Sequence, residues 1–374
     1  MKKLLIFHPA LAPYRVDQFN ALNQLYDLEV VFLCDNVWNH KFDQSKLLPL
    51  LEFKYSFLMK GLFCNGRVFR FGMLKKIRKV KPDIILGFEY SFTTQYLILL
   101  KRLGLIHQRI GSTIDDSIDI CHNIQSKGRY EARKRIVHHL DYLVVLSEEV
   151  SEFYQQVFKI KKQQIIVSPI LQEPARLRGN SDNLERIARK YQQEYHLEGK
   201  KVLLFVGRFI PEKALPRFIT NISSLLNEHE DLVFILVGDG REKESIEALI
   251  KDKSLENKVL LPGRFEGDEL HAWYVCASCF TLPSLSETFG AVVNEALIFG
   301  LKVFCSKYAG ASSLIHSGNG VIFDPLDELG TKENLNKFLG LLDKFDLIGI
   351  TNRPSLMLDY KESFIKEWRK LVYA

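Results

Sequence analysis

The residues best suited to chemistry in this chain lie in segment 283–295, which reads PSLSETFGAVVNE. Glu287 and Glu295 stand on either side of Gly290, a residue that can begin a helix. Backbone N–H groups at such a helix start lie at its positive end, where a diphosphate binds, and the two carboxylates can hold hydroxyl-rich groups beside it. A capping acid followed by a solvated helix glutamate explains each Glu singly, but not the whole string. We assign four further residues of this turn to substrate binding: Thr288, Phe289, Gly290 and Ala291.

A second loop supplies positive charge. Residues 207–213 read GRFIPEK and follow a predicted strand. Gly207 lets the backbone approach a ligand closely, Arg208 can meet a diphosphate with its planar fork, and Lys213 can meet it as a point charge. A surface turn with two solvated cations is the alternative for this loop taken alone.

Two shorter glycine loops follow the next strands. Gly238 and Gly240 open a predicted helix, but Lys243 occupies the third position of a dinucleotide fingerprint, which makes a nicotinamide enzyme less favoured. The turn Gly263-Arg264-Phe265 offers further backbone and side-chain groups. All these loops come after strands, and ligands bind beyond the carboxyl ends of the strands in an open parallel sheet.

Short apolar runs alternate with helical patterns along the chain, which predicts βαβ units and parallel sheets. In the first half we expect strands at Lys3–His8, Leu28–Cys34, Asp83–Phe88, Arg109–Ile114, Tyr142–Ser147 and Ile165–Pro169. In the second half we expect them at Val202–Gly207, Val233–Gly238, Val259–Pro262, Cys279–Pro283, Val303–Ser306 and Val321–Asp324. The polar, strandless stretch 171–200 separates the two sets, so the fold class is α/β with two Rossmann-like domains.

The 374 residues exceed one ordinary domain, and 47% hydrophobic with 26% charged residues fits a globular protein. We place the first domain at 1–175, the second at 176–345, and a final amphipathic helix within 346–374. The apolar run after Met1 is broken at His8 and Pro9, so no secretory signal is expected, and no apolar stretch is long enough to span a bilayer. Six cysteines are then best interpreted as reduced thiols in the cytoplasm.

Three other features leave alternatives open. Asp115 and Asp116, at a predicted strand end, either orient or deprotonate an acceptor hydroxyl or cap a helix. Cys276 and Cys279 have redox-motif spacing, but buried packing thiols are favoured because they run from a helix into a strand. Neither pattern resembles a metal site, and we expect none.

The charge is uneven. Residues 1–170 hold 25 Lys and Arg against 16 Asp and Glu, whereas residues 171–374 hold 26 against 29. Segment 54–81 alone contains nine basic residues and no acid. If residues 67–80 form a helix, Phe69, Met73 and Ile77 share one side, so the segment either lies on an anionic membrane or packs on its own domain with a solvated basic face. No nucleic-acid-binding pattern accompanies this charge, and nucleic acid is not an expected partner.

The order and spacing of Gly207-Arg208, Lys213, Gly238-x-Gly240, Gly263 and the Glu287–Glu295 pair resemble the donor-binding domain of the retaining family-four glycosyltransferases of GT-B fold. The likeness is strong over residues 200–330. It is weaker in the first domain, where 12–15 (APYR) are similar to the opening of bacterial polysaccharide-assembly members. Departures such as Ala214 for a common Gly, and Asp115-Asp116 near a common His-Asp pair, fall mostly on the acceptor side.

The resemblance implies an inter-domain cleft, a last helix that crosses back to the first domain, and no metal or other cofactor. It implies that Arg208 and Lys213 bind the diphosphate of a nucleotide sugar as leaving group, that Glu287 binds the sugar and Glu295 the ribose, and that the segment after Gly263 meets the base. The predicted activity is sugar transfer with retention to a saccharide or lipid-linked acceptor, in cell-surface polysaccharide synthesis at the cytoplasmic membrane face. A nucleotide-sugar epimerase and a non-catalytic sugar-nucleotide-binding subunit are the alternatives.

Overall fold

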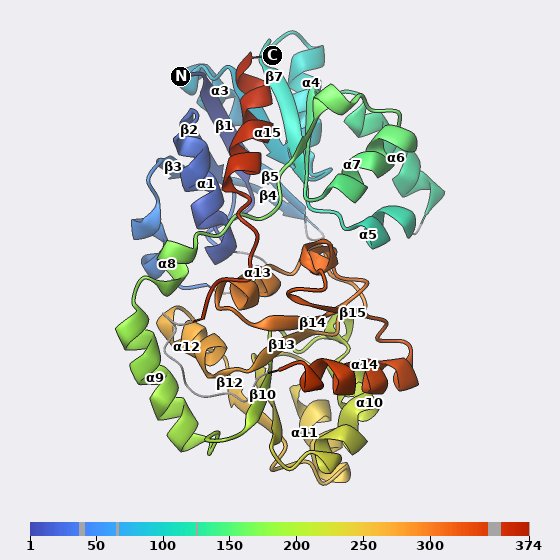
Figure 1. Cartoon of the computed structure of the whole chain (residues 1–374). Coiled ribbons are helices and arrows are strands. Elements are labelled where there is room, and N and C mark those ends of the chain that lie inside the picture. Colours follow the sequence, from blue (N-terminus) through green and yellow to red (C-terminus); the bar gives the residue numbers. More distant parts are fainter. Residues whose placement is uncertain (37–41, 65–66, 125, 343–352, 374) are drawn as a thin grey trace. The chain divides into compact units, whose positions relative to one another are not determined.

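The computed structural model describes residues 1–36, 42–64, 67–124, 126–342 and 353–373, and it divides into two α/β units (Figure 1). One unit joins Met1–Gln172 to Asp359–Ala374, and the other is Glu173–Leu358. Each unit is built around its own parallel sheet. The predicted fold class of two parallel α/β sheets is therefore confirmed.

The N-terminal unit contains a seven-stranded parallel sheet in the order β3-β2-β1-β6-β7-β8-β9. Its strands are β1 (Lys3–His8), β2 (Asp27–Phe32), β3 (Lys54–Phe57), β6 (Ile84–Phe88), β7 (Arg109–Ile114), β8 (Tyr142–Val145) and β9 (Ile165–Val167). Because successive side chains of a strand point to opposite faces, β1 serves two cores: Leu5 and Phe7 on one face, Leu4 and Ile6 on the other.

Helices cover both faces of this sheet. The face of Leu5 packs against α3 (Met73–Val80), α4 (Phe92–Arg102), α5 (Ile118–His122), α6 (Lys127–Val137) and α7 (Glu148–Gln156). The other face packs against α1 (Val16–Asn23), α2 (Gln44–Leu47) and the last helix, α15 (Lys361–Tyr373). Burial on both faces explains why the central strands are almost uninterrupted apolar runs.

Helix α15 completes the core of the N-terminal unit, although about 190 residues separate it from the rest of that unit. Its apolar stripe is Phe364, Trp368 and Leu371, all at most 2% exposed. Trp368 Nε1 donates to Ser168 Oγ at 3.0 Å, and Glu367 Oε2 accepts from Val167 N at 3.1 Å. These contacts fix the helix beside β9.

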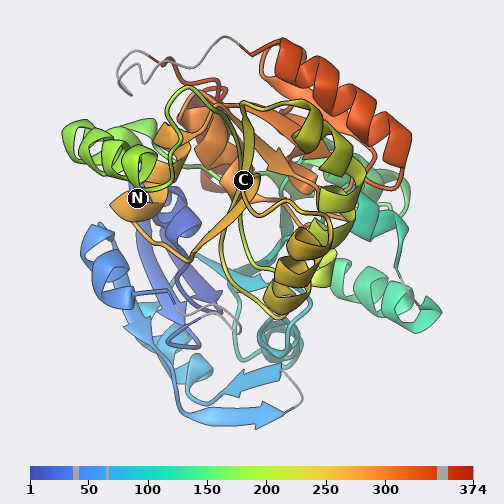
Figure 2. The ribbon, with the colours of Figure 1, turned by 90° about the horizontal axis from the view of Figure 1, so that it is seen from below.

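The segment 67–80 is not one helix, so the condition under which we inferred a single apolar stripe there does not hold. Residues Gly61–Cys64 (β4) and Arg67–Arg70 (β5) form an antiparallel pair, and α3 begins only at Met73. Gly72 separates strand from helix with φ +96°, a left-handed conformation that interrupts the helical path. Figure 2 shows the two light-blue strands at the margin of the N-terminal unit.

The apolar stripe predicted for this segment also needs correction. Met73 and Ile77 are 1% exposed and belong to the core of their own unit, and Phe69 packs on Tyr96 of α4 with ring centroids 5.3 Å apart. A helix whose apolar side is buried in this way cannot lay that side in a membrane. Of the two interpretations left open, the apolar side of α3 agrees with packing on its own domain rather than with contact to a membrane.

The C-terminal unit contains a six-stranded parallel sheet in the order β12-β11-β10-β13-β14-β15. Its strands are β10 (Lys201–Val206), β11 (Leu232–Val237), β12 (Val259–Gly263), β13 (Cys279–Leu282), β14 (Lys302–Ser306) and β15 (Gly320–Phe323). Its helices are α8 (Pro174–Arg178), α9 (Ser181–Glu194), α10 (Leu215–Glu228), α11 (Lys243–Asp252), α12 (Asp268–Cys276), α13 (Ala291–Ile298) and α14 (Glu328–Gly340). Residues 353–358 also belong to this unit: Leu356 N donates to Leu297 O at 2.8 Å.

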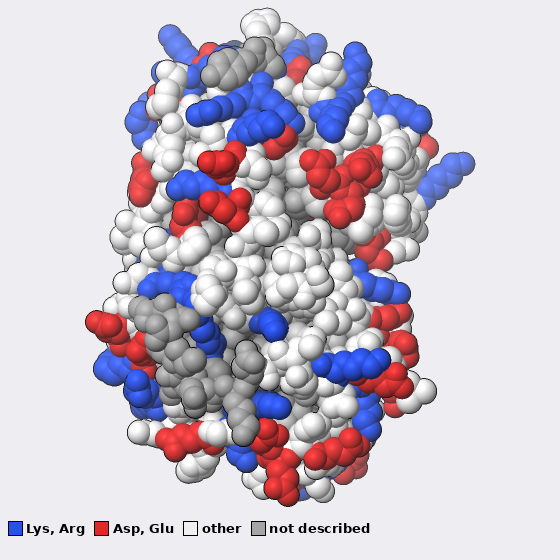
Figure 3. All heavy atoms as spheres, viewed as in Figure 1, with Lys and Arg blue, Asp and Glu red and all other residues white. Residues whose placement is uncertain are grey.

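Charge is distributed unevenly over the N-terminal unit. On the face seen in Figure 3, Lys and Arg side chains gather around the end where the N-terminus lies, and Asp and Glu side chains gather farther from it. Across the part of the chain that the structure describes, no helix combines the length and the apolar character needed to cross a bilayer.

Candidate functional site

The predicted donor residues converge where the strand order of the C-terminal sheet reverses. The loops after β10 and β13, the two neighbouring central strands, leave the sheet side by side at this point. A reversal of strand order opens a crevice beyond the carboxyl ends of the strands, which is where open α/β sheets bind ligands. Lys213 comes from the loop after β10 and Glu287 from the loop after β13. Their side chains form an ion pair in which the Lys213 side chain is 11% exposed and the Glu287 side chain 17% exposed.

Main-chain contacts hold the Glu287 loop in place. Leu285 N donates to Glu212 O at 2.8 Å, which ties the loop directly to the one that carries Lys213. On the other side, Glu287 forms an isolated parallel β-bridge with Ala309, and the carbonyl of Glu287 accepts a hydrogen bond from Gly310 N at 3.1 Å. The carboxylate is therefore fixed between two other loops rather than projecting into solvent.

The predicted helix start is present. Gly290 has φ +98° and is the N-cap residue of α13. A Cβ on this glycine would lie 2.7 Å from Leu282 Cδ2. Phe289 is 2% exposed and anchors the turn, while Thr288 is exposed and Ala291 half-buried. Among the described residues, no side chain hydrogen-bonds to this helix start as a cap. Val293 N donates to Gly290 O at 2.9 Å, so the N–H groups of Ala291 and Val292 are the ones that this helix start offers to an anionic ligand.

Glu295 lies one turn into α13 and is 8% exposed. Its Oε2 accepts a hydrogen bond of 2.7 Å from the hydroxyl of Tyr274, in α12. Burial, together with this carboxylate, raises the pKa of Tyr274 well above its ordinary value, so the phenol stays a donor. Tyr274 is a residue that we did not predict, because nothing in its local sequence connects it to a glutamate 21 residues away.

The loop glycines serve close contact between loops. A Cβ on Gly238 would lie 1.8 Å from Gly207 O, and one on Gly240 would lie 2.4 Å from Phe209 O. On Gly207, a Cβ would meet the ring of Phe205 at 2.9 Å. These glycines thus let the loops after β10 and β11 pack directly on each other, which brings their backbone groups to one place.

Arg208 is a cation of this site whose side chain has no partner among the described residues. It is half-buried, and within the described residues its guanidinium makes no hydrogen bond or ion pair. Arg264, by contrast, pairs with Glu266 and is exposed. Phe265 is half-buried against Tyr191 and Trp273, with ring centroids 5.6 and 5.8 Å apart. Gly263 has φ +103° and ends β12, as a turn there requires.

The N-terminal sheet has an equivalent reversal between β1 and β6, and it too carries an ion pair. Arg15, 3% exposed, follows β1 and pairs with Asp115, which follows β7. The backbone N–H of Asp115 donates to Glu89 Oε1 at 2.8 Å. Glu89 follows β6 with φ +53°. Burial, reinforced by the charges of Asp115 and Asp116, raises the pKa of Glu89 to about 8.

Asp116 belongs to a second part of this network. It is 4% exposed, its Oδ2 accepts from Arg133 at 3.0 Å and from the Tyr154 hydroxyl at 3.2 Å, and burial raises its pKa. Neither aspartate caps a helix, because the N-cap of α5 is Ser117, whose Oγ accepts from Ile120 N at 3.3 Å. The capping alternative is therefore wrong, whereas the acceptor-side hypothesis stays a prediction.

Sequence reasoning missed Glu89, Arg133 and Tyr154 because each lies on a different element from the aspartates. The available signal was topological: Glu89 directly follows a strand next to the reversal. His8, at the end of β1, is also buried, and burial lowers its pKa to about 3, so it carries no charge at neutral pH.

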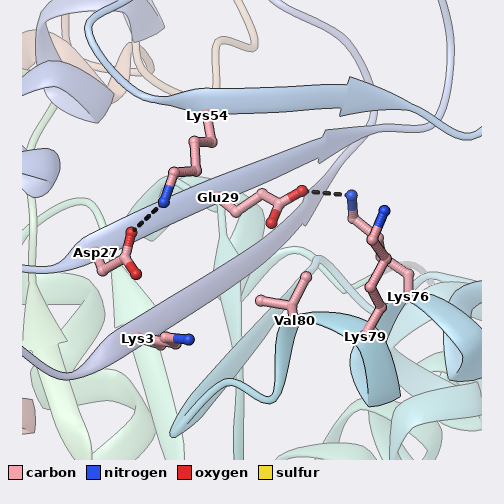
Figure 4. Close-up of a pocket in the computed structure, with 7 residues that line it drawn as sticks. All are labelled: Lys3, Asp27, Glu29, Lys54, Lys76, Lys79 and Val80. Carbon is pink, nitrogen blue, oxygen red and sulfur yellow. Dashed lines mark hydrogen bonds and ion pairs between the residues drawn. The ribbon is translucent and has the colours of Figure 1, made fainter.

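A pocket at the opposite, amino edge of the N-terminal sheet is unrelated to these residues (Figure 4). Two of its four lysines are paired within it: Lys54 pairs with Asp27 at 3.1 Å, and Lys76 pairs with Glu29. No group of His, Cys, Asp or Glu in the described ranges could hold a metal ion. Cys276 and Cys279 are buried, and burial raises the pKa of the Cys276 thiol to about 12, as expected of packing thiols.

Comparison with known proteins relates part of this chain to sugar transferases. A family model described as Glycosyl transferases group 1 matches residues 187–342. The 2-deoxystreptamine N-acetyl-D-glucosaminyltransferase of Niallia circulans is 30% identical over 162 residues, which are 43% of this chain and 42% of that protein. Three curated relatives are matched over half of their own length or less.

Two solved structures show that the likeness in fold extends over the chain. The crystal structure of Anabaena HepE in complex with UDP and glucose covers 100% of both chains with a TM-score of 0.73 and 16% identity. The crystal structure of WaaG, a glycosyltransferase involved in lipopolysaccharide biosynthesis, aligns with 90% of this chain over 90% of its own length, with a TM-score of 0.63 and 16% identity. Residues 187–342 therefore match the model of the group 1 glycosyl transferases, in a chain that has the GT-B fold.

Proposed function

We propose that this protein transfers a sugar from a nucleotide diphosphate sugar to a saccharide or lipid-linked acceptor, with retention of configuration. The observation that carries the proposal is the meeting of the Arg208–Lys213 loop with the Glu287–Glu295 segment at the strand-order reversal of the C-terminal sheet. This arrangement lies wholly within the segment that matches the glycosyl transferase family, and its relative of 30% identity is named as a sugar transferase.

Each residue then has a role that its chemistry allows. Arg208 supplies a half-buried guanidinium without a partner among the described residues, which suits a diphosphate, and the N–H groups of α13 add positive potential. Lys213, oriented by Glu287, adds a second cation that stabilises the charge of the departing diphosphate. Glu287 also accepts hydrogen bonds from the transferred sugar.

Glu295 would bind the ribose hydroxyls. Its carboxylate is held by the Tyr274 hydroxyl, so its position is fixed before any ligand arrives. The turn Gly263-Arg264-Phe265 lies at the carboxyl end of β12, where it would meet the base. The proposed donor chemistry needs no divalent metal, because two cations and a helix start can neutralise the developing charge.

On the acceptor side we propose that the Glu89–Asp115 pair positions a hydroxyl group of the acceptor. Both residues follow central strands of the N-terminal sheet, and Arg15 holds the Asp115 carboxylate. A carboxyl group with a pKa near 8 can exchange a proton at neutral pH. The acceptor and the place of action that we propose are those of cell-surface polysaccharide synthesis at the cytoplasmic membrane face.

The test is a screen of purified protein against nucleotide diphosphate sugars by thermal shift, followed by turnover assays with the stabilising donor. Transfer to an added saccharide with an unchanged anomeric configuration supports the proposal. Conversion of the donor sugar without any acceptor identifies an epimerase instead. Donor binding without transfer or hydrolysis identifies a non-catalytic subunit, and stabilisation by none of the donors removes the proposal.

A further inference from the structure

Buried polar residues of the N-terminal unit lie between its last helix and Asp115. Ser168 is 1% exposed, and Arg15 and Gln18 are both 3% exposed. A polar or charged side chain that is cut off from water destabilises a protein unless other groups hydrogen-bond to it. The partners of these three residues therefore show what keeps them in the interior.

The partners form one continuous series of contacts. Trp368 Nε1 donates to Ser168 Oγ at 3.0 Å. Gln18 Nε2 donates to the same oxygen at 3.2 Å, and Gln18 Oε1 accepts from Arg15 Nη1 at 2.6 Å. The series ends where Arg15 Nη2 pairs with Asp115 Oδ2. We call Trp368, Ser168, Gln18 and Arg15 the Arg15 network.

The chemistry of these side chains fixes the direction of each hydrogen bond. A guanidinium has only donors, so the Gln18 amide must turn its oxygen toward Arg15 and its NH2 group toward Ser168. An indole N–H is also only a donor, so Ser168 Oγ accepts from Trp368 and from Gln18. A rotated amide would face Arg15 with donors, and the network therefore permits one orientation of Gln18.

Arg15 and Gln18 are held close together by the local fold. Arg15 ends the short 3-10 helix η1 (Pro13–Arg15), and Gln18 lies in the first turn of α1, which follows directly. Residues three apart lie on the same side of a helix, so the amide meets the guanidinium. Gln18 and Asp115 each take one terminal nitrogen of Arg15, and together they determine where its planar group lies.

Exposure increases only at the last member of the series. Trp368 is 2% exposed, like the other buried members, whereas the side chain of Asp115 is 19% exposed. Asp115 is also held through its main chain, because its backbone N–H donates to Glu89 Oε1 at 2.8 Å. The series thus runs from a dry interior to a carboxylate that a ligand can reach.

We propose that Gln18, Ser168 and Trp368 are positioning residues of the acceptor site. They orient Arg15, and Arg15 in turn holds the Asp115 carboxylate toward the acceptor hydroxyl. The role of Asp115 rests on the proposed function, whereas the orientation of Arg15 by Gln18 does not. Because Trp368 belongs to α15, this site is complete only when the last helix has packed on the N-terminal unit.

The Arg15 network and the proposed donor residues belong to different units. The network lies in Met1–Gln172 and Asp359–Ala374, whereas Lys213, Glu287 and Glu295 lie in Glu173–Leu358. Loss of a network contact should therefore slow transfer to the acceptor without weakening donor binding. A network that served stability alone would change neither quantity in variants that still fold.

Kinetics of the full chain test the positioning role. Gln18→Met removes both hydrogen bonds of the amide, and it should lower kcat/KM for the acceptor by about tenfold or more, with an unchanged donor Kd in calorimetry. Ser168→Ala leaves Arg15 its partner and should lower kcat/KM by less. The matched control is Tyr26→Phe, which removes a buried hydroxyl that donates to Trp368 O outside the network, and it should leave kcat/KM unchanged.

A double-mutant cycle tests whether the effect passes through Asp115. Asp115→Asn removes the charge that Arg15 holds, so Gln18→Met should lower kcat/KM much less in that background than in the unchanged protein. Equal losses in the two backgrounds would show that Gln18 does not act through Asp115.

The indole of Trp368 gives a readout that needs no activity. The chain contains three tryptophans, so Trp368→Phe assigns the indole N–H signal of Trp368 in a 1H–15N spectrum. Ser168→Ala removes the acceptor of this N–H and should shift the signal. Gln18→Met should shift it as well, because Gln18 donates to the same oxygen, and Lys127→Gln, at an exposed position of α6, should not.

Three results would overturn the inference: a Trp368 signal that does not move in Gln18→Met, an unchanged kcat/KM in that variant, or an equal loss of kcat/KM in Tyr26→Phe. Failure of the proposed function gives a different result. In that case the unchanged protein transfers no sugar, and the acceptor role of the network is refuted with it. Transfer by the unchanged protein together with full activity of Gln18→Met refutes the positioning role alone.

Discussion

Lys213 and Glu287 are 74 residues apart in the sequence, yet their side chains form a mostly buried ion pair at the strand-order reversal of the C-terminal sheet. The pair connects the two loops that carry most of the proposed donor residues. Removing either partner leaves a charge with little solvent around it, whereas removing both does not. This asymmetry makes the pair directly measurable.

We expect a coupling free energy of about 1 to 3 kcal/mol between Lys213 and Glu287 in a double-mutant cycle. The variants are Lys213→Met, Glu287→Gln and the double substitution, and the measurement is urea unfolding followed by circular dichroism. Lys54 and Asp27 form the comparison cycle, because that pair is 73% and 39% exposed and should couple by less than about 1 kcal/mol. Equal coupling in both cycles would mean that Lys213 and Glu287 are no better shielded than a surface pair.

Donor binding should depend on both ends of the proposed site. Lys213→Ala and Glu295→Ala should each weaken binding of a nucleoside diphosphate by about 1.5 to 3 kcal/mol, because each removes a charge-assisted hydrogen bond. Isothermal calorimetry on the folded variants measures this directly. Lys251→Ala, which removes an exposed cation in α11, is the control. Unchanged affinity in both site variants would refute the donor assignment.

The Tyr274–Glu295 hydrogen bond should stabilise the C-terminal unit. Tyr274→Phe keeps the stacked ring but removes the 2.7 Å bond to the carboxylate, and we expect a loss of about 1.5 to 3 kcal/mol in the free energy of unfolding. In the Glu295→Gln background the same substitution should cost less, because the accepting charge is gone. An identical cost in both backgrounds would show that the phenol acts through packing alone.

Gly290 is required by backbone conformation and by space. Gly290→Ala places a Cβ at φ +98° and 2.7 Å from a Leu282 methyl group, and it should destabilise the protein by about 1 to 3 kcal/mol. Gly128→Ala is the control, because that glycine lies in α6 with nothing within 4 Å of the added Cβ. It should stabilise the protein by about 0.5 kcal/mol, so the two thermal shifts should have opposite signs.

The buried carboxyl of Glu89 should make stability fall as the pH rises. Its pKa is about 8 in the folded protein against 4.5 in an exposed chain, so between these values the folded state binds the extra proton and stability decreases with pH. Glu89→Gln removes this dependence of the free energy of unfolding on pH. The free energy of unfolding of the variant, relative to that of the unchanged protein, should therefore rise by more than about 1 kcal/mol between pH 5 and pH 8. Parallel stability curves for the two proteins would contradict the raised pKa.

The strands could be predicted from the sequence wherever both faces of a sheet are covered. β10 and β11 are continuous apolar runs because both of their faces are buried, and such runs are unambiguous when Gly-containing loops follow them. The edge strand β3 reads KYSF and is mostly exposed, so it lacks that signal. The hairpin was missed because Lys and Arg at helical spacing obscured it, although Asn65-Gly66 is a dipeptide typical of two-residue hairpin turns.

The site was predictable to the level of loops but not of contacts. Gly290 and the helix after it follow from local chain chemistry, and the structure contains both. The bonds of Tyr274 to Glu295 and of Arg15 to Asp115 depend on which helices and strands become neighbours. That information lies in the strand order, and residues 100 positions apart, as Arg15 and Asp115 are, have no local pattern that joins them.

The return of α15 to the N-terminal unit affects the order in which the protein can fold during translation. The C-terminal unit is a single continuous stretch, so the ribosome has delivered all of it once Leu358 has left the exit tunnel. The N-terminal unit is synthesised first, but its sheet lacks the cover of Phe364, Trp368 and Leu371 until the last helix emerges. The part made first is therefore the part completed last, and in nascent chains its apolar sheet face is the surface that chaperones would meet.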